Sequence, residues 1–245
     1  MRFLDSGLLA RIIWCKQSHS AINDRTFLGP DGCPVGVNWR YDRAEILSDG
    51  IVHAVGLSLA LIGAITLLVV SSQSTQGLEA ASLVIYSLGL LAMLGFSAAY
   101  NMWPVSPRKW WLRRLDHSAI FLFIAATYSP LIAQMKSGTT FVLLIIIWLV
   151  AALGVGLKCV LPGRFDRLSI ALCLSLGASG IFVYESAVTT LPSSTLWLIA
   201  TGGSLYSVGI IFHLWEGLRF QNAIWHSFVL VAASCHYAAI ILAIA

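Results

Sequence analysis

Long apolar stretches separated by short polar connections dominate the chain after its first 45 residues. A helix needs about 20 apolar residues to cross the roughly 30 Å hydrocarbon layer of a bilayer. Seven stretches meet this requirement, and none shows the apolar/polar alternation of barrel strands. The pattern predicts an all-α integral membrane protein, a bundle of seven transmembrane helices at Ile51–Val70, Ala80–Tyr100, His117–Ala133, Thr139–Val160, Leu168–Val188, Thr195–Trp215 and Ala223–Ala245.

The composition supports this fold class. Of 245 residues, 58% are hydrophobic and only 11% are charged, whereas a soluble domain carries about a quarter charged residues. A chain with so few charges cannot cover a water-facing surface, which excludes a soluble globular protein. Ordinary glycine and proline contents and only five cysteines also exclude fibrous, disordered and disulfide-scaffold proteins.

The basic residues predict the orientation of the bundle. All Lys and Arg residues except Lys136 fall in the N-terminal segment or in the second, fourth and sixth connections. Because cytoplasmic loops carry the excess of cations, the N-terminus is predicted to be cytoplasmic and the C-terminus outside, in a plasma or inner membrane. The net charge of +4 then reflects topology and gives no support to nucleic-acid binding.

The first part of the chain differs in kind from the rest. Residues 1–44 hold six cations and the turn-rich run Gly29–Pro34, and they predict a cytoplasmic segment that is partly ordered at most. Residues 45–245 form the predicted membrane domain. Cys15 and Cys33 are expected as free thiols on the reducing side of the membrane. The other three cysteines are isolated and are expected to pack as small apolar side chains: Cys159, Cys173 and Cys235.

Polar side chains from four predicted spans converge near the cytoplasmic edge. Ionisable groups inside a membrane are costly, so each is a candidate functional group. Ser97 and Asn101 are four residues apart, as are Asn222 and His226, so each pair shares a helix face. The alternating direction of the spans brings further residues to this depth. The predicted polar pocket consists of His53, Ser97, Asn101, Asp116, Asn222 and His226.

Each of these residues also has a structural interpretation. Asp116 precedes an apolar run and suits the N-cap of the third span. The histidines suit hydrogen bonding at the interface, and the asparagines suit interhelical hydrogen bonding. His236 lies ten residues beyond His226, about 15 Å deeper, and is expected to pack outside the pocket. All four lysines lie outside the spans or at their ends, which excludes a mid-membrane Schiff base.

Three sequence blocks together resemble the hemolysin III family of the progestin and adiponectin-receptor-like (PAQR) superfamily. The first is Glu45–His53, which reads EILSDGIVH. The second is SAAYN, ending at Asn101, with RRLDHS around Asp116. The third is AIWHSFV around His226, with the Cys235–Tyr237 triplet. The resemblance covers about residues 43–242 and leaves out the N-terminal segment.

The resemblance implies a zinc site near the cytoplasmic edge. In the family pattern one histidine closing the second span and two histidines four apart in the seventh hold the metal, with Ser and Asp beside a metal-bound water. Ser97, Asp116 and His226 match this pattern, whereas Asn101 and Asn222 stand where histidines are expected. An amide oxygen is a poor substitute for imidazole on zinc. His53 or His117 could supply a replacement ligand.

Several functions are therefore open. The first is a non-catalytic hemolysin III-like multi-pass membrane protein with a degenerate metal site, no cofactor and His226 as a weak metal residue. The second is a zinc-dependent membrane hydrolase of a lipid amide, with Ser97 and Asp116 in catalysis. A transporter or channel is the third. Membrane lipid is the expected partner, as environment, ligand or substrate, and cytolysis is treated as a family label.

Overall fold

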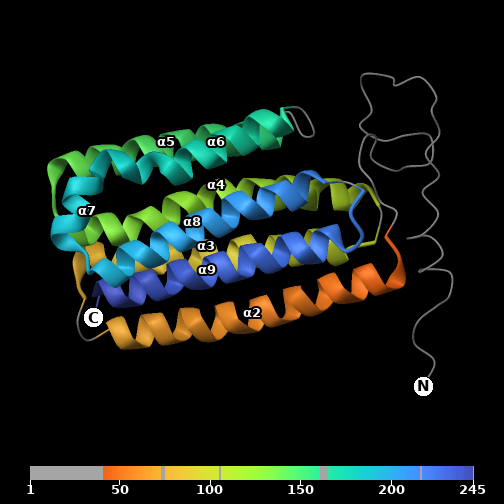
Figure 1. The fold of residues 1–245 in the computed structure, drawn as a ribbon, viewed down its shortest axis with the longest axis horizontal. Coiled ribbons are helices and arrows are strands. Elements are labelled where there is room, and N and C mark those ends of the chain that lie inside the picture. The colour runs from red at the N-terminus through yellow and green to blue at the C-terminus, as the bar shows by residue number, and fades with distance from the viewer. Residues whose placement is uncertain (1–40, 73–74, 105, 161–164, 216, 245) are drawn as a thin grey trace.

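The computed structural model describes residues 41–72, 75–104, 106–160, 165–215 and 217–244. Within these ranges the chain is a bundle of long helices without strands (Figure 1). Seven helical segments are long and apolar enough to cross a membrane, the fifth being composed of α6, η1 and α7. The predicted seven-helix membrane bundle is thus confirmed. The elements are α2 Arg43–Ser71, α3 Gly77–Met102, α4 Pro107–Met135, α5 Gly138–Val160, α6 Asp166–Ala178, η1 Ser179–Val183, α7 Tyr184–Thr190, α8 Ser193–Leu214 and α9 Gln221–Ile244.

A reciprocal pair of hydrogen bonds sets the start of α2. The Asp42 carboxylate accepts from the Glu45 backbone N–H, and the Glu45 carboxylate accepts from the Asp42 N–H, both at 2.8 Å. This capping box satisfies backbone donors that a helix start leaves free. Helix α2 therefore begins at Arg43 rather than at the predicted Ile51, which places Asp49 and His53 inside the helix.

The expected role of Asp116 as a helix cap is wrong. Helix α4 begins at Pro107, and Ser106 occupies the N-cap. Proline suits the first turn because it has no backbone N–H to leave unsatisfied. Asp116 consequently lies more than two turns inside α4, which is the most buried of the seven spans.

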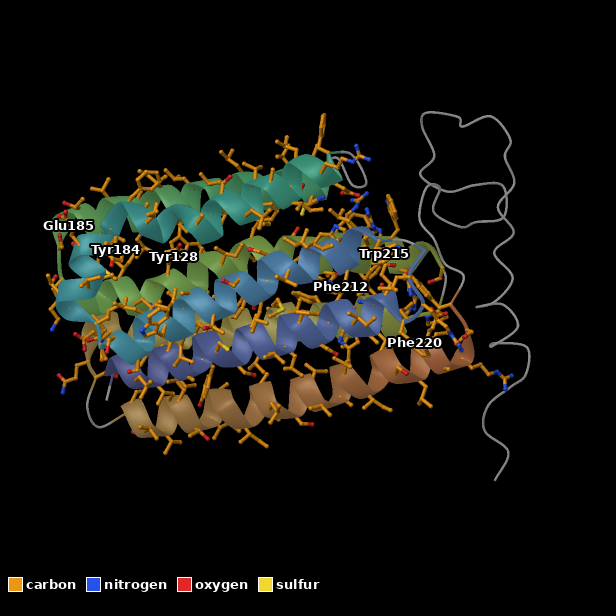
Figure 2. All side chains as sticks on the ribbon, in the orientation of Figure 1. Tyr128, Tyr184, Glu185, Phe212, Trp215 and Phe220 are labelled. Carbon is orange, nitrogen blue, oxygen red and sulfur yellow. The ribbon has the colours of Figure 1, made fainter. Side chains whose placement is uncertain are left out.

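The fifth span is interrupted, where the sequence predicts one continuous helix over Leu168–Val188. Helix α6 ends at Ala178, a 3-10 turn follows over Ser179–Val183, and α7 resumes at Tyr184. Tyr128 of α4 braces this break (Figure 2). Its hydroxyl accepts from the Gly180 N–H at 2.9 Å and donates to the Gly177 carbonyl at 2.8 Å. A neighbouring helix thus satisfies backbone groups that have no water to bind.

Two glycines allow neighbouring helices to approach closely. A Cβ on Gly154 of α5 would lie 2.5 Å from the Phe121 ring of α4, and one on Gly202 of α8 would lie 2.3 Å from the His236 ring of α9. His236 donates from Nε2 to the Ile199 carbonyl at 3.4 Å. It packs within the α8–α9 pair and also lines the internal cavity of the bundle. Large apolar side chains cover the outside of the bundle, where they suit contact with lipid, as on α2 at Leu59, Ile62 and Val69.

Four helices begin at one end of the bundle: α2, α4, α6 and α9 (Figure 1). We call this the basic end. Lys109, Arg113, Lys158, Arg167 and Arg219 lie there, whereas Lys136 lies at the opposite end, paired with Glu79 at 3.1 Å. The basic end corresponds to the side for which the sequence predicts the cytoplasm.

Candidate metal centre

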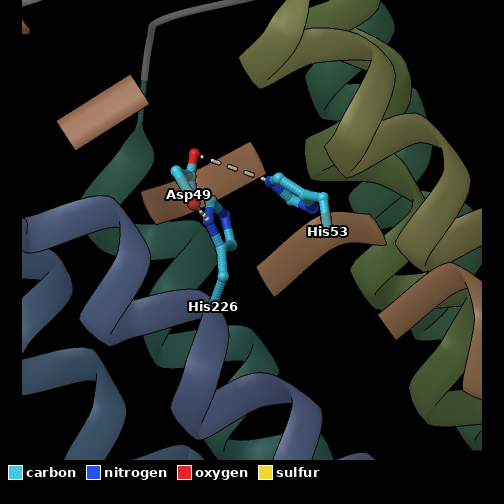
Figure 3. Close-up of side chains that lie close together, drawn as sticks. All are labelled: Asp49, His53 and His226. Carbon is cyan, nitrogen blue, oxygen red and sulfur yellow. Dashed lines mark hydrogen bonds and ion pairs between the residues drawn. The ribbon is translucent and has the colours of Figure 1, made fainter. Parts of the chain in front are cut away.

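One acidic and two imidazole side chains meet between α2 and α9 near the basic end (Figure 3). Asp49 and His53 lie one turn apart on α2 and therefore share a face, and His226 reaches them from α9. His226 Nδ1 donates to Asp49 Oδ1 at 2.6 Å. His53 Nε2 lies 3.6 Å from Asp49 Oδ2, and the two imidazole centroids are 4.4 Å apart. The side chains of Asp49 and His53 are 5% exposed and that of His226 is 11% exposed.

The geometry of this group suits a metal ion. One ligand atom from each residue lies within 4.8 Å of the other two. His53 Nε2 is buried and has no hydrogen-bond partner among the described residues, which is costly unless something binds it. Two histidines and a carboxylate are the protein ligands of open zinc sites, and the same set occurs with iron(II).

Ser97 and Asn101 extend the group onto α3. The Ser97 hydroxyl lies 3.4 Å from His226 Nε2, on the side of the ring opposite Asp49. Because Nδ1 carries the proton donated to Asp49, Nε2 accepts from that hydroxyl. Asn101 Nδ2 donates to the Ser97 carbonyl at 2.9 Å and lies 3.5 Å from its hydroxyl. Lys109 closes the end of α3 by donating to the Asn101 carbonyl at 3.1 Å.

The structure brings most of the predicted pocket to one cavity. This cavity has a volume of about 1600 Å³ and is lined by five of the predicted residues, Ser97, Asn101, Asp116, Asn222 and His226, together with Asp49. His53 stands outside its lining and contacts the His226 ring. Of the two proposed replacement ligands, His53 joins the Asp49 group and His117 does not. His117 Nε2 lies 4.0 Å from Asp116 Oδ2.

Asp49 is the site residue that the sequence analysis missed. The first span was predicted to start at Ile51, so Asp49 was placed outside the membrane and was not considered. A usable signal was present, because Asp49 precedes His53 by four residues, the spacing that paired Ser97 with Asn101. The capping-box residues Asp42 and Glu45 could have extended α2 back to include it.

Comparison with known proteins agrees with this architecture. A family model described as haemolysin-III related matches residues 44–237. The chain belongs to this family. It is 32% identical over 187 residues to a hemolysin-3 homolog of Bacillus subtilis (strain 168), covering 76% of this chain and 88% of the relative. It is also 32% identical over 165 residues to the human monocyte to macrophage differentiation factor, covering 64% and 67%.

The zinc ligand set implied by the resemblance does not fit this hemolysin III-family chain at two positions. Asn101 uses its amide to hold Ser97, and Asn222 lines the cavity. The Asp49–His53–His226 group does fit a metal, because it supplies a carboxylate and two imidazoles, one of them with an unsatisfied nitrogen. The candidate ligand group thus lies nearer α2 than the ligand set that the resemblance implies.

Proposed function

We propose that this hemolysin III-family protein binds a divalent transition metal, best matched by zinc, through Asp49, His53 and His226. The observation that carries the proposal is the convergence of two buried side chains and one half-buried side chain from two helices. One of their nitrogens, His53 Nε2, has no hydrogen-bond partner among the described residues. Buried polar atoms are normally hydrogen-bonded, so the His53 nitrogen marks a missing partner.

The ligands divide the work between them. Asp49 and His53 offer their ligand atoms from one face of α2, and His226 offers its own from α9. On binding, the metal takes the place of the proton between His226 Nδ1 and Asp49 Oδ1, because a ligating imidazole nitrogen must be deprotonated. Three protein ligands would leave one coordination position of a zinc ion free, and the ion would supply a Lewis acid for a substrate oxygen. Ser97 and Asp116 line the adjoining cavity and contact a substrate placed there.

Metal content of the purified full chain tests this function. We expect about one zinc per chain by elemental analysis after exposure to zinc and removal of excess, and loss of zinc in His53→Ala and His226→Ala. His236→Ala is the matched control, because His236 is a half-buried histidine of the same helix α9 outside the group. A wild-type chain without metal at saturating zinc contradicts the proposal, as does a His53→Ala variant with full zinc content.

A second candidate function rests on the alignment of Ser97, His226 and Asp49. Hydroxyl, imidazole and carboxylate follow one another at 3.4 and 2.6 Å, the order of groups in a serine nucleophile relay. In this function Ser97 Oγ attacks the carbonyl carbon of a lipid amide and its proton passes to His226 Nε2. His226 returns the proton to the leaving amine, and water then hydrolyses the acyl group from Ser97.

Labelling of Ser97 separates this hydrolase from a metal protein without catalysis. A fluorophosphonate probe is expected to modify Ser97 in the presence of a chelator, as located by peptide mass spectrometry, and to fail with Ser97→Ala. Ser207→Ala serves as the control, since Ser207 lines the same cavity but donates to the Gly203 carbonyl. Absence of Ser97 modification in the chelator-treated protein favours the non-catalytic function.

We also propose the predicted orientation, with the N-terminus in the cytoplasm and the protein in a plasma or inner membrane. The support is the concentration of cations at the basic end. A C-terminal reporter that is active only in the cytoplasm is expected to stay silent. Activity of that reporter contradicts the orientation.

A further inference from the structure

A second charged cluster joins α4, α5 and α6 at the basic end. Arg113 Nη2 pairs with Asp166 Oδ2 at 2.8 Å, and Lys158 Nζ pairs with Asp166 Oδ1 at 2.5 Å. The cations are withdrawn from solvent, with side chains 11% exposed for Arg113 and 4% for Lys158, while that of Asp166 is 38% exposed. Two buried cations therefore share a single, more accessible carboxylate.

This cluster has one positive charge in excess. A buried charge is costly unless it is paired, and among the described residues no other carboxylate of the cavity wall forms an ion pair with Arg113 or Lys158. Asp49 accepts from His226, Glu45 accepts from the Asp42 and Phe220 backbone N–H groups, and Asp116 Oδ2 lies 4.0 Å from His117 Nε2. An anion entering the cluster would restore the balance.

The surroundings of the cluster are those of an amphiphile site. Arg113, Lys158 and Asp166 belong to the wall of the large cavity, whose adjoining lining is apolar, with Ile120 and Ile124 on α4 and Ile170 and Leu174 on α6. The Arg113 guanidinium lies 5.2 Å from the centre of the Trp110 ring. Tryptophans mark the headgroup level of a bilayer, so the cations stand where a lipid headgroup lies and the apolar wall stands where its chains lie.

From this placement we propose that Arg113 and Lys158 bind the phosphate of an anionic phospholipid, whose acyl chain lies along the apolar wall formed by α4 and α6. Asp166 is the internal counter-charge that the phosphate displaces. Basic pockets between transmembrane helices bind such headgroups, and the arginine fork suits two phosphate oxygens. The site uses none of the metal ligands.

Lipid retention by the purified full chain tests the proposal. Native mass spectrometry of protein titrated with phosphatidylglycerol or phosphatidylcholine is expected to show preferential retention of phosphatidylglycerol. Arg113→Gln and Lys158→Gln are each expected to weaken that retention about fivefold, while Lys158→Arg keeps it. Asp166→Asn is expected to strengthen it, because the competing carboxylate is gone.

Arg108→Gln is the matched control, because Arg108 is an exposed cation on the same helix. Equal loss with Arg108→Gln, or no phosphatidylglycerol preference in the wild type, overturns the proposal. If millimolar inorganic phosphate displaces the lipid, the site binds free phosphate, and the proposal of a phospholipid ligand is wrong.

A measurement on the wild type keeps the proposal testable if the glutamine variants do not fold. A phosphatidylglycerol with a photoactivatable acyl chain is expected to label peptides that contain Ile120 or Ile170. Labelling confined to other helices overturns the proposal. Zinc content is expected to be unchanged in Arg113→Gln, so failure of the metal function and failure of the lipid site are separate results.

Discussion

The two charged clusters at the basic end differ in sign and in the burial of their carboxylate, because the side chain of Asp49 is 5% exposed and that of Asp166 is 38% exposed. Between α2 and α9, one carboxylate faces two imidazoles, one of which has an unsatisfied nitrogen. Among α4, α5 and α6, one carboxylate faces two permanent cations. In both clusters two nitrogen-containing side chains face one carboxylate. An imidazole can offer a lone pair to a cation, whereas guanidinium and ammonium groups can only donate hydrogen bonds.

This difference teaches what each cluster can accept. The Asp49 group suits a metal cation, because a carboxylate and neutral imidazoles are all electron-pair donors. The Asp166 group suits an anion, because it has more hydrogen-bond donors, all on cationic side chains, than carboxylate acceptors. One end of the bundle therefore carries two sites of opposite chemistry on one cavity.

The largest expected effect is a double dissociation between the two carboxylates. Asp49→Asn is expected to lower zinc affinity by about 10–100-fold, since an amide replaces a charged ligand, and to leave phosphatidylglycerol retention unchanged. Asp166→Asn is expected to raise that retention and leave zinc affinity unchanged. Zinc titration measures the zinc affinity of both variants, and native mass spectrometry measures their phosphatidylglycerol retention. Loss of zinc binding in Asp166→Asn would show that the two clusters act as one site.

The next effect concerns the packing that holds the Asp166 cluster together. Gly154→Ala places a methyl group against Phe121 and is expected to lower the free energy of unfolding by about 2–3 kcal/mol. Gly156→Ala is the control, because no atom lies within 4 Å of a Cβ there. Thermal unfolding in detergent compares the two, and equal melting temperatures would show that α4 and α5 lie farther apart.

A smaller effect is expected at the break in the fifth span. Tyr128→Phe leaves the Gly180 N–H without its acceptor and is expected to cost about 1–2 kcal/mol of stability. Hydrogen exchange at Gly180 is expected to increase. Tyr184→Phe is the control, because Tyr184 is 63% exposed; protection at Gly180 that survives in Tyr128→Phe would assign the brace to another group.

The smallest effect is a pH dependence at the start of α2. The hydrogen bond from the Glu45 backbone N–H, helped by Arg219, holds the pKa of Asp42 below its ordinary value. A lowered pKa in the folded state stabilises the protein above the ordinary pKa of about 3.9, and this contribution is lost as pH falls through the folded value. The melting temperature of Asp42→Ala should therefore lie slightly below that of the wild type at pH 6 and approach it near pH 3. A difference in melting temperature between the two proteins that widens as the pH falls contradicts a stabilising role of the Asp42 carboxylate as the helix cap.

The sequence predicted the spans well because apolar length is a strong signal in a membrane protein. It placed the start of α2 at Ile51 and of the third span at His117, since it followed apolar residues, whereas the helices begin at Arg43 and Pro107. Polar first turns carry the caps and the interfacial charges, and hydropathy does not register them. This error in the boundaries is what hid Asp49.

The contacts of the candidate site were only partly predictable from the sequence. Ser97, Asn101 and His226 meet as the spacing suggested. The choice of His53 over His117 depends on how α2 rotates against α9, which no spacing within one helix determines. The pairing of Arg113 with Asp166 across 53 residues likewise depends on the approach of α4 to α6.

The brace from Tyr128 has a consequence for how the chain enters the bilayer. A continuous helix can leave the translocon and stand alone in lipid, because its backbone groups are satisfied within the segment. The fifth span contains backbone groups at Gly177 and Gly180 that bind the Tyr128 hydroxyl instead. Integration of this segment is therefore tied to the prior presence of α4, so the two must leave the insertion machinery as partners.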